Sequence, residues 1–349
     1  MKNVLLCIGI ILSINLLLGC ASNMNLKDKY KDYFPLGAAV NAATITSSED
    51  LLKTHFKSLT AENEMKPESI HPRLGKWQFY GADEIADFAR DNNMLMRGHT
   101  FVWHQQMPGW FFSSMGGPVD RELLLERVKE HMEVMAERYN DVVYAWDVVN
   151  EAISDEKEEY LRPSPFLKII GEDYIDLAFH MAHEIMPEAK LFYNDYSVLD
   201  PVKQDKIYKL LSDMIDRGVP VDGIGLQGHW DIYYPEAHIL EEAIERFAGL
   251  GLDIHITELD VSFFKFSDRD SRYKEPPPSL LKMQNERYDS IFEVLRRNHD
   301  KVQAVTFWGV ADYSTWLDHF PVKGRKNWPL LFDVDQNPKP AFDSVMDFR

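Results

Sequence analysis

The fold of this chain is decided by two stretches of its sequence, Trp146-Asp147-Val148-Val149-Asn150-Glu151-Ala152 and Ile254-His255-Ile256-Thr257-Glu258-Leu259-Asp260. In each stretch a mostly apolar run leads into a glutamate, which indicates a buried strand that ends in a polar position. The carboxyl ends of the strands of a parallel barrel all open onto one face. Glu151 and Glu258 can therefore meet in one cleft although they are far apart along the chain.

Short apolar runs alternate with helix-like stretches along most of the chain. Strands are predicted at 36–40, 58–61, 94–100, 143–149, 190–194, 223–227, 253–257 and 302–307. Apolar residues recur at helical spacing over 82–91, 121–139, 174–185, 203–217, 237–250 and 280–296. The prolines Pro276 to Pro278 predict a rigid surface loop. The alternation predicts an α/β protein with a single (β/α)8 TIM barrel and no linker to a second domain.

Two glutamates in one cleft predict paired carboxylate chemistry, whereas either one alone is common in an acidic protein. Glycoside hydrolysis needs this pairing, because one carboxylic acid protonates the leaving oxygen while one carboxylate attacks the anomeric carbon. The chain also contains 8 Trp and 15 Tyr, which suits a cleft that stacks on sugar rings.

Other phrases surround the two glutamates in a fixed order. They are TAENEMKPE at 60–68, GHTFVWH at 98–104, GLQGHW at 225–230 and FWG at 307–309. Together with the two glutamate phrases, they resemble the glycoside hydrolase family 10 xylanases from about Phe34 to Phe342. The resemblance implies a retaining endo-β-1,4-xylanase that hydrolyses internal xylosidic bonds of xylan by double displacement.

The resemblance makes Glu151 the general acid/base and Glu258 the nucleophile. The residues offer a physical reason for these roles. An imidazole from His229, oriented by Asp260, can hold Glu258 ionised. Apolar neighbours and a like charge across the cleft favour the neutral form of Glu151.

The resemblance also implies a set of substrate contacts. Asn150 matches the asparagine that binds the 2-hydroxyl of the reacting sugar, a contact that strengthens in the transition state. Around the same ring lie Lys66, His99, Trp103 and Gln227, with His104 close enough in sequence to join or support them. Glu62 and Asn63 match the residues for the next sugar on the glycone side, and Gln106 is expected to join them.

Aromatic residues complete the expected cleft. Trp308 and Trp316 roof the reacting site, although either can instead be barrel packing, and Tyr196 stacks the first sugar of the leaving group. Ser197 departs from the family, which more often has asparagine there. A basic loop carries Lys323, Arg325 and Lys326; it is either a solvated loop or a contact for uronic acid substituents of the polymer.

The first residues predict export and a lipid anchor. Lys2 precedes an apolar run, and Leu17-Leu18-Gly19-Cys20 looks like a bacterial lipobox. We expect a lipoprotein signal peptide at 1–19, a tether over 20–32 that starts at a lipidated Cys20, and a catalytic domain over 33–349. The alternative is an ordinary signal peptide with an incidental cysteine. The membrane face on which the anchored enzyme would stand is left open.

Composition limits the partners. The net charge of −18 argues against a nucleic-acid or anionic-membrane partner, since such binding needs clustered Lys and Arg. We expect a monomer that binds xylan or xylo-oligosaccharides, with no cofactor and no metal. The alternatives are a retaining TIM-barrel cellulase, a hydrolase restricted to xylo-oligosaccharides, and a non-catalytic glycan-binding lipoprotein.

Overall fold

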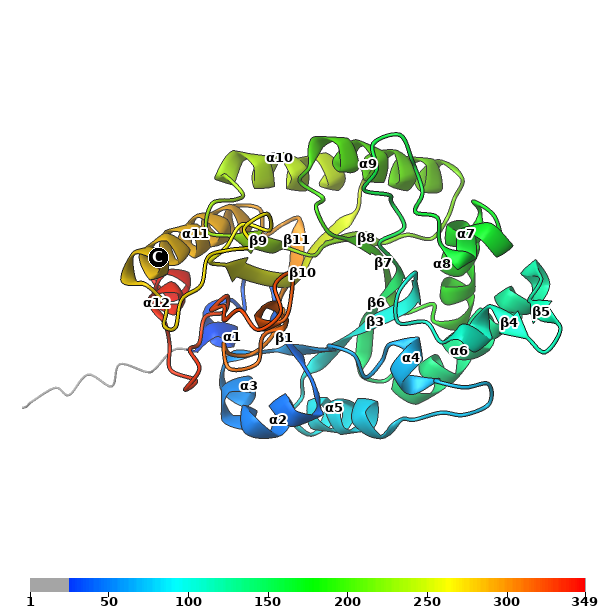
Figure 1. Cartoon of the computed structure of the whole chain (residues 1–349), viewed down its shortest axis with the longest axis horizontal. Coiled ribbons are helices and arrows are strands. Elements are labelled where there is room, and N and C mark those ends of the chain that lie inside the picture. The colour runs from blue at the N-terminus through cyan, green and yellow to red at the C-terminus, as the bar shows by residue number, and fades with distance from the viewer. Residues whose placement is uncertain (1–24, 349) are drawn as a thin grey trace, which may run out of the picture.

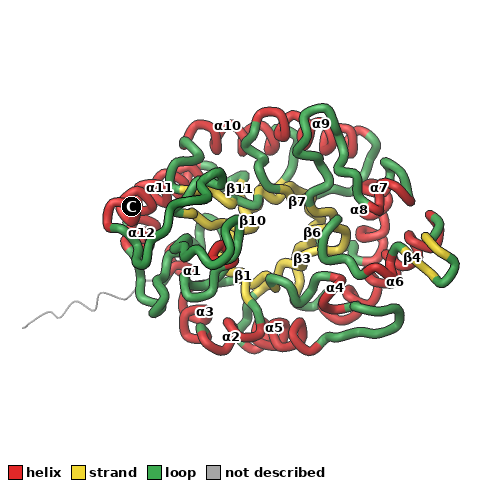
Figure 2. Tube along the Cα trace, in the orientation of Figure 1, coloured by secondary structure: helices red, strands yellow, loops and turns green. Residues whose placement is uncertain are grey.

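The computed structural model describes residues 25–348. Eight parallel strands form a closed ring at its centre, and helices surround this ring (Figures 1 and 2). Neighbouring strands follow the order β11-β1-β2-β3-β6-β7-β8-β10, and β10 pairs with β11 to close the ring. The predicted (β/α)8 barrel is confirmed.

The strands of the barrel are β1 (Leu36–Val40), β2 (Ser58–Ala61), β3 (Leu95–Trp103), β6 (Val143–Asn150), β7 (Lys190–Asp195), β8 (Gly223–Leu226), β10 (Asp253–Ser262) and β11 (Val302–Phe307). Short strands lie outside the ring: β4 (Ser113–Ser114), β5 (Gly117–Pro118) and β9 (His229–Asp231).

The helices are α1 (Leu26–Lys29), α2 (Ala42–Ser47), α3 (Glu49–His55), α4 (Pro67–Ile70), α5 (Tyr80–Asp91), α6 (Arg121–Tyr139), α7 (Pro165–Ile169), α8 (Tyr174–Ile185), α9 (Pro201–Asp216), α10 (Ala237–Ala248), α11 (Pro278–Arg297) and α12 (Pro340–Met346). None of the helices within 25–348 is both long enough and apolar enough to cross a membrane.

The strands are buried almost throughout, as expected of a parallel sheet that helices cover on one side and barrel side chains fill on the other. Close packing restricts which residue type fits at some positions of the barrel. Trp146 in β6 stacks on Phe101 in β3 with ring centroids 4.1 Å apart. A Cβ on Gly98 would lie only 2.0 Å from the Trp146 ring, so this position admits glycine alone.

Several expected boundaries differ from the structure; β3, for example, ends at Trp103 and not at residue 100. β10 continues past residue 257, because β9 pairs with its second half and places His229 opposite Asp260. Glu258 therefore lies inside a strand. Pro276 and Pro277 lie in a loop as predicted, but Pro278 is the first residue of α11, where its fixed φ suits a helix and its missing N–H costs nothing.

The predicted tether over 20–32 is wrong from residue 25 onward. Leu26 and Tyr30 are fully buried, and the Tyr30 hydroxyl donates to the carbonyl of Val345 at 2.7 Å. These side chains are four positions apart, the spacing of one helix face, so α1 can bury both against the barrel. Residues 25–32 therefore belong to the folded domain. The signal peptide and Cys20 lie outside the described residues.

Candidate active site

Glu151 and Glu258 both lie at the carboxyl end of the barrel. Glu151 directly follows β6 and adopts a left-handed backbone conformation, with φ of 57°. Its N–H donates to the carbonyl of Asn194 in β7 at 2.9 Å. Glu151 is 8% exposed and Glu258 is 5% exposed, so both carboxyl groups are largely removed from water.

Two side chains contact the Glu258 carboxylate, and Asp260 orients one of them. Nε2 of His229 lies 3.1 Å from one oxygen of Glu258, and Nδ1 lies 3.0 Å from Asp260. The Asn194 amide donates to the other oxygen at 2.8 Å. A Cβ on Gly225 would lie 2.2 Å from the Asn194 side chain, so glycine leaves the space that this asparagine occupies. Sequence reasoning missed Asn194.

This arrangement favours the ionised form of Glu258. Burial alone would raise its pKa, but the hydrogen bond from His229, the nearby His99 and the Asn194 amide together lower it. Burial would likewise lower the pKa of His229, yet Asp260 and Glu258 raise it to about 10. The imidazole is therefore a cation that stands between two carboxylates.

The surroundings of Glu151 favour its protonated form instead. Trp103 Nε1 donates to one of its oxygens at 2.7 Å and Gln227 Nε2 donates to the other at 3.0 Å. Burial raises the pKa of Glu151, the charge of Asp195 adds to the rise, and the two hydrogen bonds oppose it without cancelling it. The like charge expected from Glu258 contributes less than the charge of Asp195, which sequence reasoning missed.

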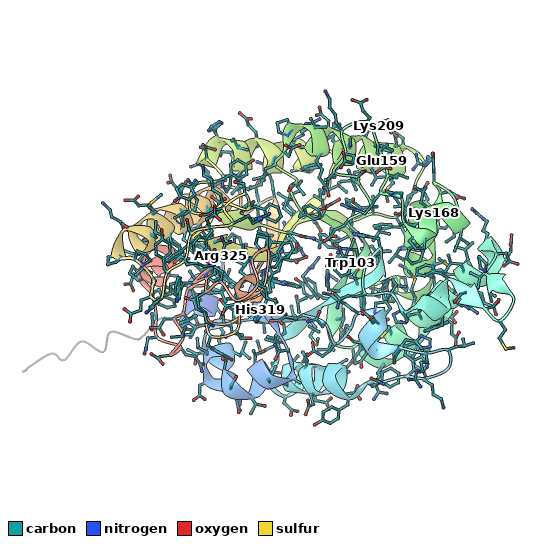
Figure 3. The ribbon with its side chains drawn as sticks, in the orientation of Figure 1. Trp103, Glu159, Lys168, Lys209, His319 and Arg325 are labelled. Atoms are coloured by element: carbon teal, nitrogen blue, oxygen red, sulfur yellow. The ribbon has the colours of Figure 1, made fainter. Side chains whose placement is uncertain are left out.

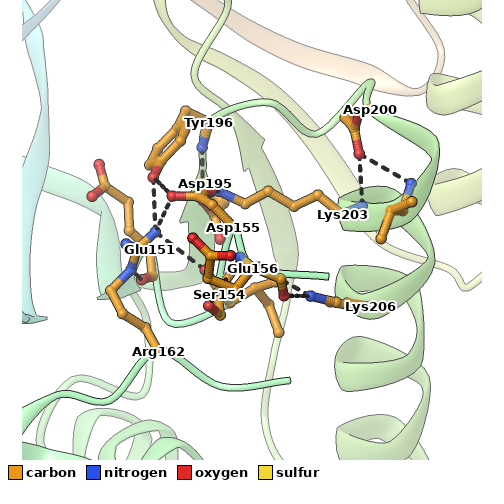
Figure 4. Close-up of polar contacts among 12 residues, drawn as sticks. Glu151, Ser154, Asp155, Glu156, Arg162, Asp195, Tyr196, Asp200, Lys203 and Lys206 are labelled. Carbon is orange, nitrogen blue, oxygen red and sulfur yellow. Dashed lines mark hydrogen bonds and ion pairs between the residues drawn. The ribbon is translucent and has the colours of Figure 1, made fainter. Parts of the chain in front are cut away.

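A buried group of polar side chains lies next to Glu151, and Figure 4 shows two of its members, Asp195 and Lys203. The Tyr193 hydroxyl accepts from the N–H groups of Ala152 and Ile153, each at 3.1 Å, and donates to Asp195. Asp195 also pairs with Lys203 of α9 at 2.9 Å. Tyr193-Asn194-Asp195-Tyr196 is a polar run at the carboxyl end of a predicted strand, which is the signal that could have revealed this group.

Arg162 and Tyr196 lie beside Glu151, on the side where the leaving group is expected. Arg162 donates from Nε to the carbonyl of Glu151 at 3.1 Å and from Nη2 to the Tyr196 hydroxyl at 2.8 Å. The Tyr196 hydroxyl donates to Asp155, and the Lys203 ammonium lies 3.4 Å from the centre of the Tyr196 ring. The ring is thus fixed in place next to Glu151, as a stacking surface for a sugar requires.

The glycone side gathers four of the predicted residues. The side-chain oxygen Oδ1 of Asn63 accepts from Lys66 Nζ at 3.2 Å and from Gln106 Nε2 at 3.1 Å. The Lys66 ammonium lies 4.9 Å from the centre of the Trp103 ring, and Trp103 lies near the middle of the ring of strands (Figure 3). Burial raises the pKa of the neighbouring Glu62. Lysine, amide and carboxyl groups together offer donors and acceptors to sugar hydroxyls.

Asn150 and His99 are both buried. The amides of Asn150 and Asn194 are 2.9 Å apart, so Asn150 stands beside the nucleophile. Nδ1 of His99 lies 2.9 Å from Asp147, which also binds Arg97. The His99 ring meets Trp308 edge-on, with centroids 5.6 Å apart.

Trp316 follows β11 and lies against Asp260 and His229. Its Nε1 donates to Asp260 at 2.8 Å, and its ring centre lies 4.9 Å from that of His229. Phe320 stacks on it at 5.1 Å. The indole is therefore fixed to the same aspartate that orients the imidazole.

His104 lies toward the leaving-group side. It lines a small pocket together with Glu151, Arg162 and Tyr174. Burial lowers its pKa to about 4, and the charge of Arg162 adds to this effect. The ring stands near Glu151, and its centre lies 5.9 Å from that of Trp103.

The basic loop is mainly structural. Arg325 is only 1% exposed, donates to the carbonyl of Asp268 at 2.7 Å and stacks on Phe264. Lys326 pairs with Asp318. The proposed contact with uronic acids is therefore wrong for Arg325 (labelled in Figure 3), because its guanidinium is used to hold the loop.

The parallel barrel has two buried carboxyl groups at one face, one with a raised pKa and one with a lowered pKa. This is the arrangement that a glycoside hydrolase uses. The model of the family described as "Glycosyl hydrolase family 10" matches residues 25–348. This chain therefore belongs to glycosyl hydrolase family 10, as its motifs predicted.

Similar proteins agree with this assignment. Endo-1,4-beta-xylanase A of Caldicellulosiruptor saccharolyticus is 50% identical over 93% of this chain and 96% of that protein. The beta-1,4-xylanase of Dictyoglomus thermophilum is 49% identical over 93% and 91%. The crystal structure of an endo-1,4-beta-xylanase from Caldicellulosiruptor owensensis is 49% identical, has a TM-score of 0.91, and shares 93% of this chain and 99% of that chain.

Proposed function

We propose that this protein is a retaining endo-1,4-β-xylanase in which Glu258 is the nucleophile and Glu151 the general acid/base. The observation that carries the proposal is the opposite tuning of the two carboxyl groups: the pKa of Glu258 is lowered and that of Glu151 is raised. An ionised nucleophile beside a protonated acid is the starting state of double displacement.

In the first step, the Glu258 carboxylate attacks the anomeric carbon while Glu151 gives its proton to the departing glycosidic oxygen. The bond to the leaving sugar breaks, and a covalent glycosyl-enzyme forms. In the second step, Glu151, now ionised, takes a proton from water, whose oxygen displaces Glu258 from the anomeric carbon. Two inversions give net retention, and Glu151 is again protonated.

The neighbours of each glutamate support these steps. His229 and the Asn194 amide stabilise negative charge on Glu258 before attack and when it leaves the intermediate. The Trp103 and Gln227 donors hold both oxygens of Glu151, which keeps its proton aimed in one direction. Asn150 lies beside the nucleophile, where it can bind the 2-hydroxyl of the reacting sugar.

Two measurements test the proposal. NMR of the first product formed from an aryl β-xylobioside should show the β-anomer before mutarotation; an α-anomer would show inversion. Product analysis on plain xylan, arabinoxylan and glucuronoxylan should show mixed oligosaccharides early in the reaction, with little release from carboxymethylcellulose. Hydrolysis confined to short oligosaccharides would support the oligosaccharide-restricted alternative, and preference for the cellulosic polymer would support a cellulase.

We also propose that the enzyme is exported and anchored to a bacterial membrane through lipidated Cys20. The support is the lipobox Leu17-Leu18-Gly19-Cys20 after an apolar run. A diacylglyceryl group and an amide-linked chain supply the two signals that stable anchoring needs. Native protein should partition with membranes, and Cys20→Ser should be soluble or unprocessed; equal partitioning of the two forms would rule out lipid attachment.

A further inference from the structure

The face of the barrel opposite the catalytic cleft carries a concave basic surface. It is lined by residues that precede strands β1, β2 and β3, which places it at the amino ends of the strands. The catalytic residues lie at the carboxyl ends, so the two sites are on opposite faces of one barrel.

Four lysines line this surface: Lys27, Lys31, Lys53 and Lys57. Asp28 lies among them, and Glu49 pairs with Lys53. Lys57 donates to the carbonyl of Asn93 at 2.7 Å and Lys27 donates to the carbonyl of Lys53, so backbone dipoles fix two of the ammonium groups without neutralising them. We name these four residues the lysine face. It is a cationic region on a chain whose net charge is −18.

The part of the chain that the structure describes begins at this same face. α1 begins at Leu26, next to Lys27, and its first N–H lies 3.4 Å from the His55 ring at the end of α3. From Cys20 to Asn25 there are only five residue steps, which span at most about 18 Å when fully extended. A lipid on Cys20 would therefore hold the lysine face close to the membrane surface.

We propose that the lysine face binds the anionic headgroups of the membrane to which Cys20 is anchored, and that this contact turns the catalytic cleft toward the polymer outside. The proposal rests on the lipid anchor proposed above. Lysines near an anionic surface are attracted to it, and the effect fades beyond a Debye length of about 8–10 Å.

The charge of the rest of the protein strengthens the preference for one orientation. An anionic membrane attracts the positively charged lysine face and repels the acidic remainder of the protein surface. The lipid supplies attachment, so the lysines need to supply only orientation. Soluble substrate then reaches the cleft without passing between enzyme and bilayer.

Orientation can be measured on the full-length, processed lipoprotein in vesicles. The chain has 2 cysteines, Cys7 in the signal peptide and Cys20 itself, so an introduced cysteine can be labelled alone. Asp91→Cys places a fluorophore at the end of α5, beside the lysine face, and Glu158→Cys places one in the exposed loop after β6 on the catalytic side. Each change removes one carboxylate, so the pair is matched in charge.

Vesicles carry a headgroup quencher and contain either phosphatidylcholine alone or phosphatidylcholine with phosphatidylglycerol. We expect strong quenching at position 91 and weak quenching at 158 in anionic vesicles, with the difference reduced in neutral vesicles and at high salt. Lys31→Glu with Lys57→Glu should abolish the difference. Each lysine shifts the orientation equilibrium about fivefold, so reversing two should shift it by at least about 25-fold.

The matched control is Lys209→Glu with Lys282→Glu, exposed lysines on α9 and α11 that change the net charge equally. It should leave the quenching difference intact. The proposal would be overturned by equal quenching at positions 91 and 158 or by a quenching difference that is unchanged in neutral vesicles. It would also be overturned if the lysine-face variant and the control variant changed the quenching difference equally. Failure of the anchor itself is seen separately, because Cys20→Ser would then partition like the native protein.

Discussion

Tyr193→Phe is the change that most directly tests how Glu151 is held. The phenol oxygen is the only atom removed, and the ring remains in its buried site. That oxygen accepts from the N–H groups of Ala152 and Ile153 and donates to Asp195. All three contacts lie next to Glu151, whose φ of 57° is uncommon for a residue other than glycine.

The size of the effect follows from these contacts. Two buried N–H groups lose their acceptor, and an unsatisfied buried group costs about 1–3 kcal/mol. We expect the free energy of unfolding to fall by about 2–4 kcal/mol, with some relief if the loop shifts. Such a shift also lets Glu151 leave its left-handed conformation, which costs about 1–3 kcal/mol to hold. Because a displacement of 1 Å can cost about 100-fold in rate, we expect kcat on xylan to fall by about 10–100-fold with little change in KM.

The assay compares substrates that differ in their need for a proton. Xylan and phenyl xylobioside need protonation of the leaving oxygen, whereas dinitrophenyl xylobioside needs little. If Tyr193 acts through Glu151, the first two should lose activity and the third should be nearly unaffected. Tyr139→Phe is the control, since its buried hydroxyl bonds Asp83 on the outer helices and its loss should lower stability without this split.

An equal loss on all three substrates would refute the reasoning, because it would mean that the substitution disturbs the whole cleft. So would full activity on xylan combined with lowered stability. In that case, the hydroxyl would be a packing contact only, and the conformation of Glu151 would be maintained by other contacts.

The remaining predictions concern the nucleophile, the cleft wall and the core. Glu258→Ala should lose activity on every substrate, whereas Glu151→Ala should keep turnover of dinitrophenyl xylobioside and regain deglycosylation with azide; azide rescue of Glu258→Ala alone, measured with identified products, would exchange the roles. His229→Ala removes a donor that lowers the pKa of Glu258, so the acidic limb of kcat/KM against pH should move to higher pH, because less of the nucleophile is ionised at low pH; an unmoved limb would contradict this. Trp316→Ala should narrow the preference for aryl xylobioside over aryl cellobioside, which in the native enzyme should be roughly 10–200-fold, and an unchanged ratio of kcat/KM would show that another side chain is the wall. Burial lowers the pKa of His131 to about 3 from 6.5, so stability present above pH 6.5 is lost as pH falls toward 3; in urea titrations His131→Phe should flatten that part of the pH dependence, and an unchanged slope would count against it.

The barrel could be predicted because its signal is repeated. Each strand is a short apolar run and each helix has its own spacing, so small errors at the ends do not change the topology. The predicted element boundaries were wrong where tertiary contacts determine the ends of an element. β10 extends because β9 pairs with it, and α1 folds because Tyr30 finds the carbonyl of Val345. Neither partner is near in sequence.

The two glutamates differ in how much of their environment the sequence reveals. Asp260 lies two residues beyond Glu258 on the same strand, and His229 belongs to a recognisable phrase, so their proximity to the nucleophile could be expected. The pairing of β9 with β10 gives the geometry: it sets His229 opposite Asp260 and holds the imidazole between two carboxylates.

Glu151 depends instead on residues from the next strand and helix. The largest charge acting on it is Asp195, whose own charge is held by Lys203 from α9. If Lys203 were replaced by methionine, Asp195 would lose the cation that opposes the effect of burial on its pKa. A protonated Asp195 would no longer raise the proton affinity of Glu151. The protonation of Glu151 therefore depends on its burial and on an ion pair that only the folded barrel brings together, which is why a sequence motif can name this glutamate without explaining its chemistry.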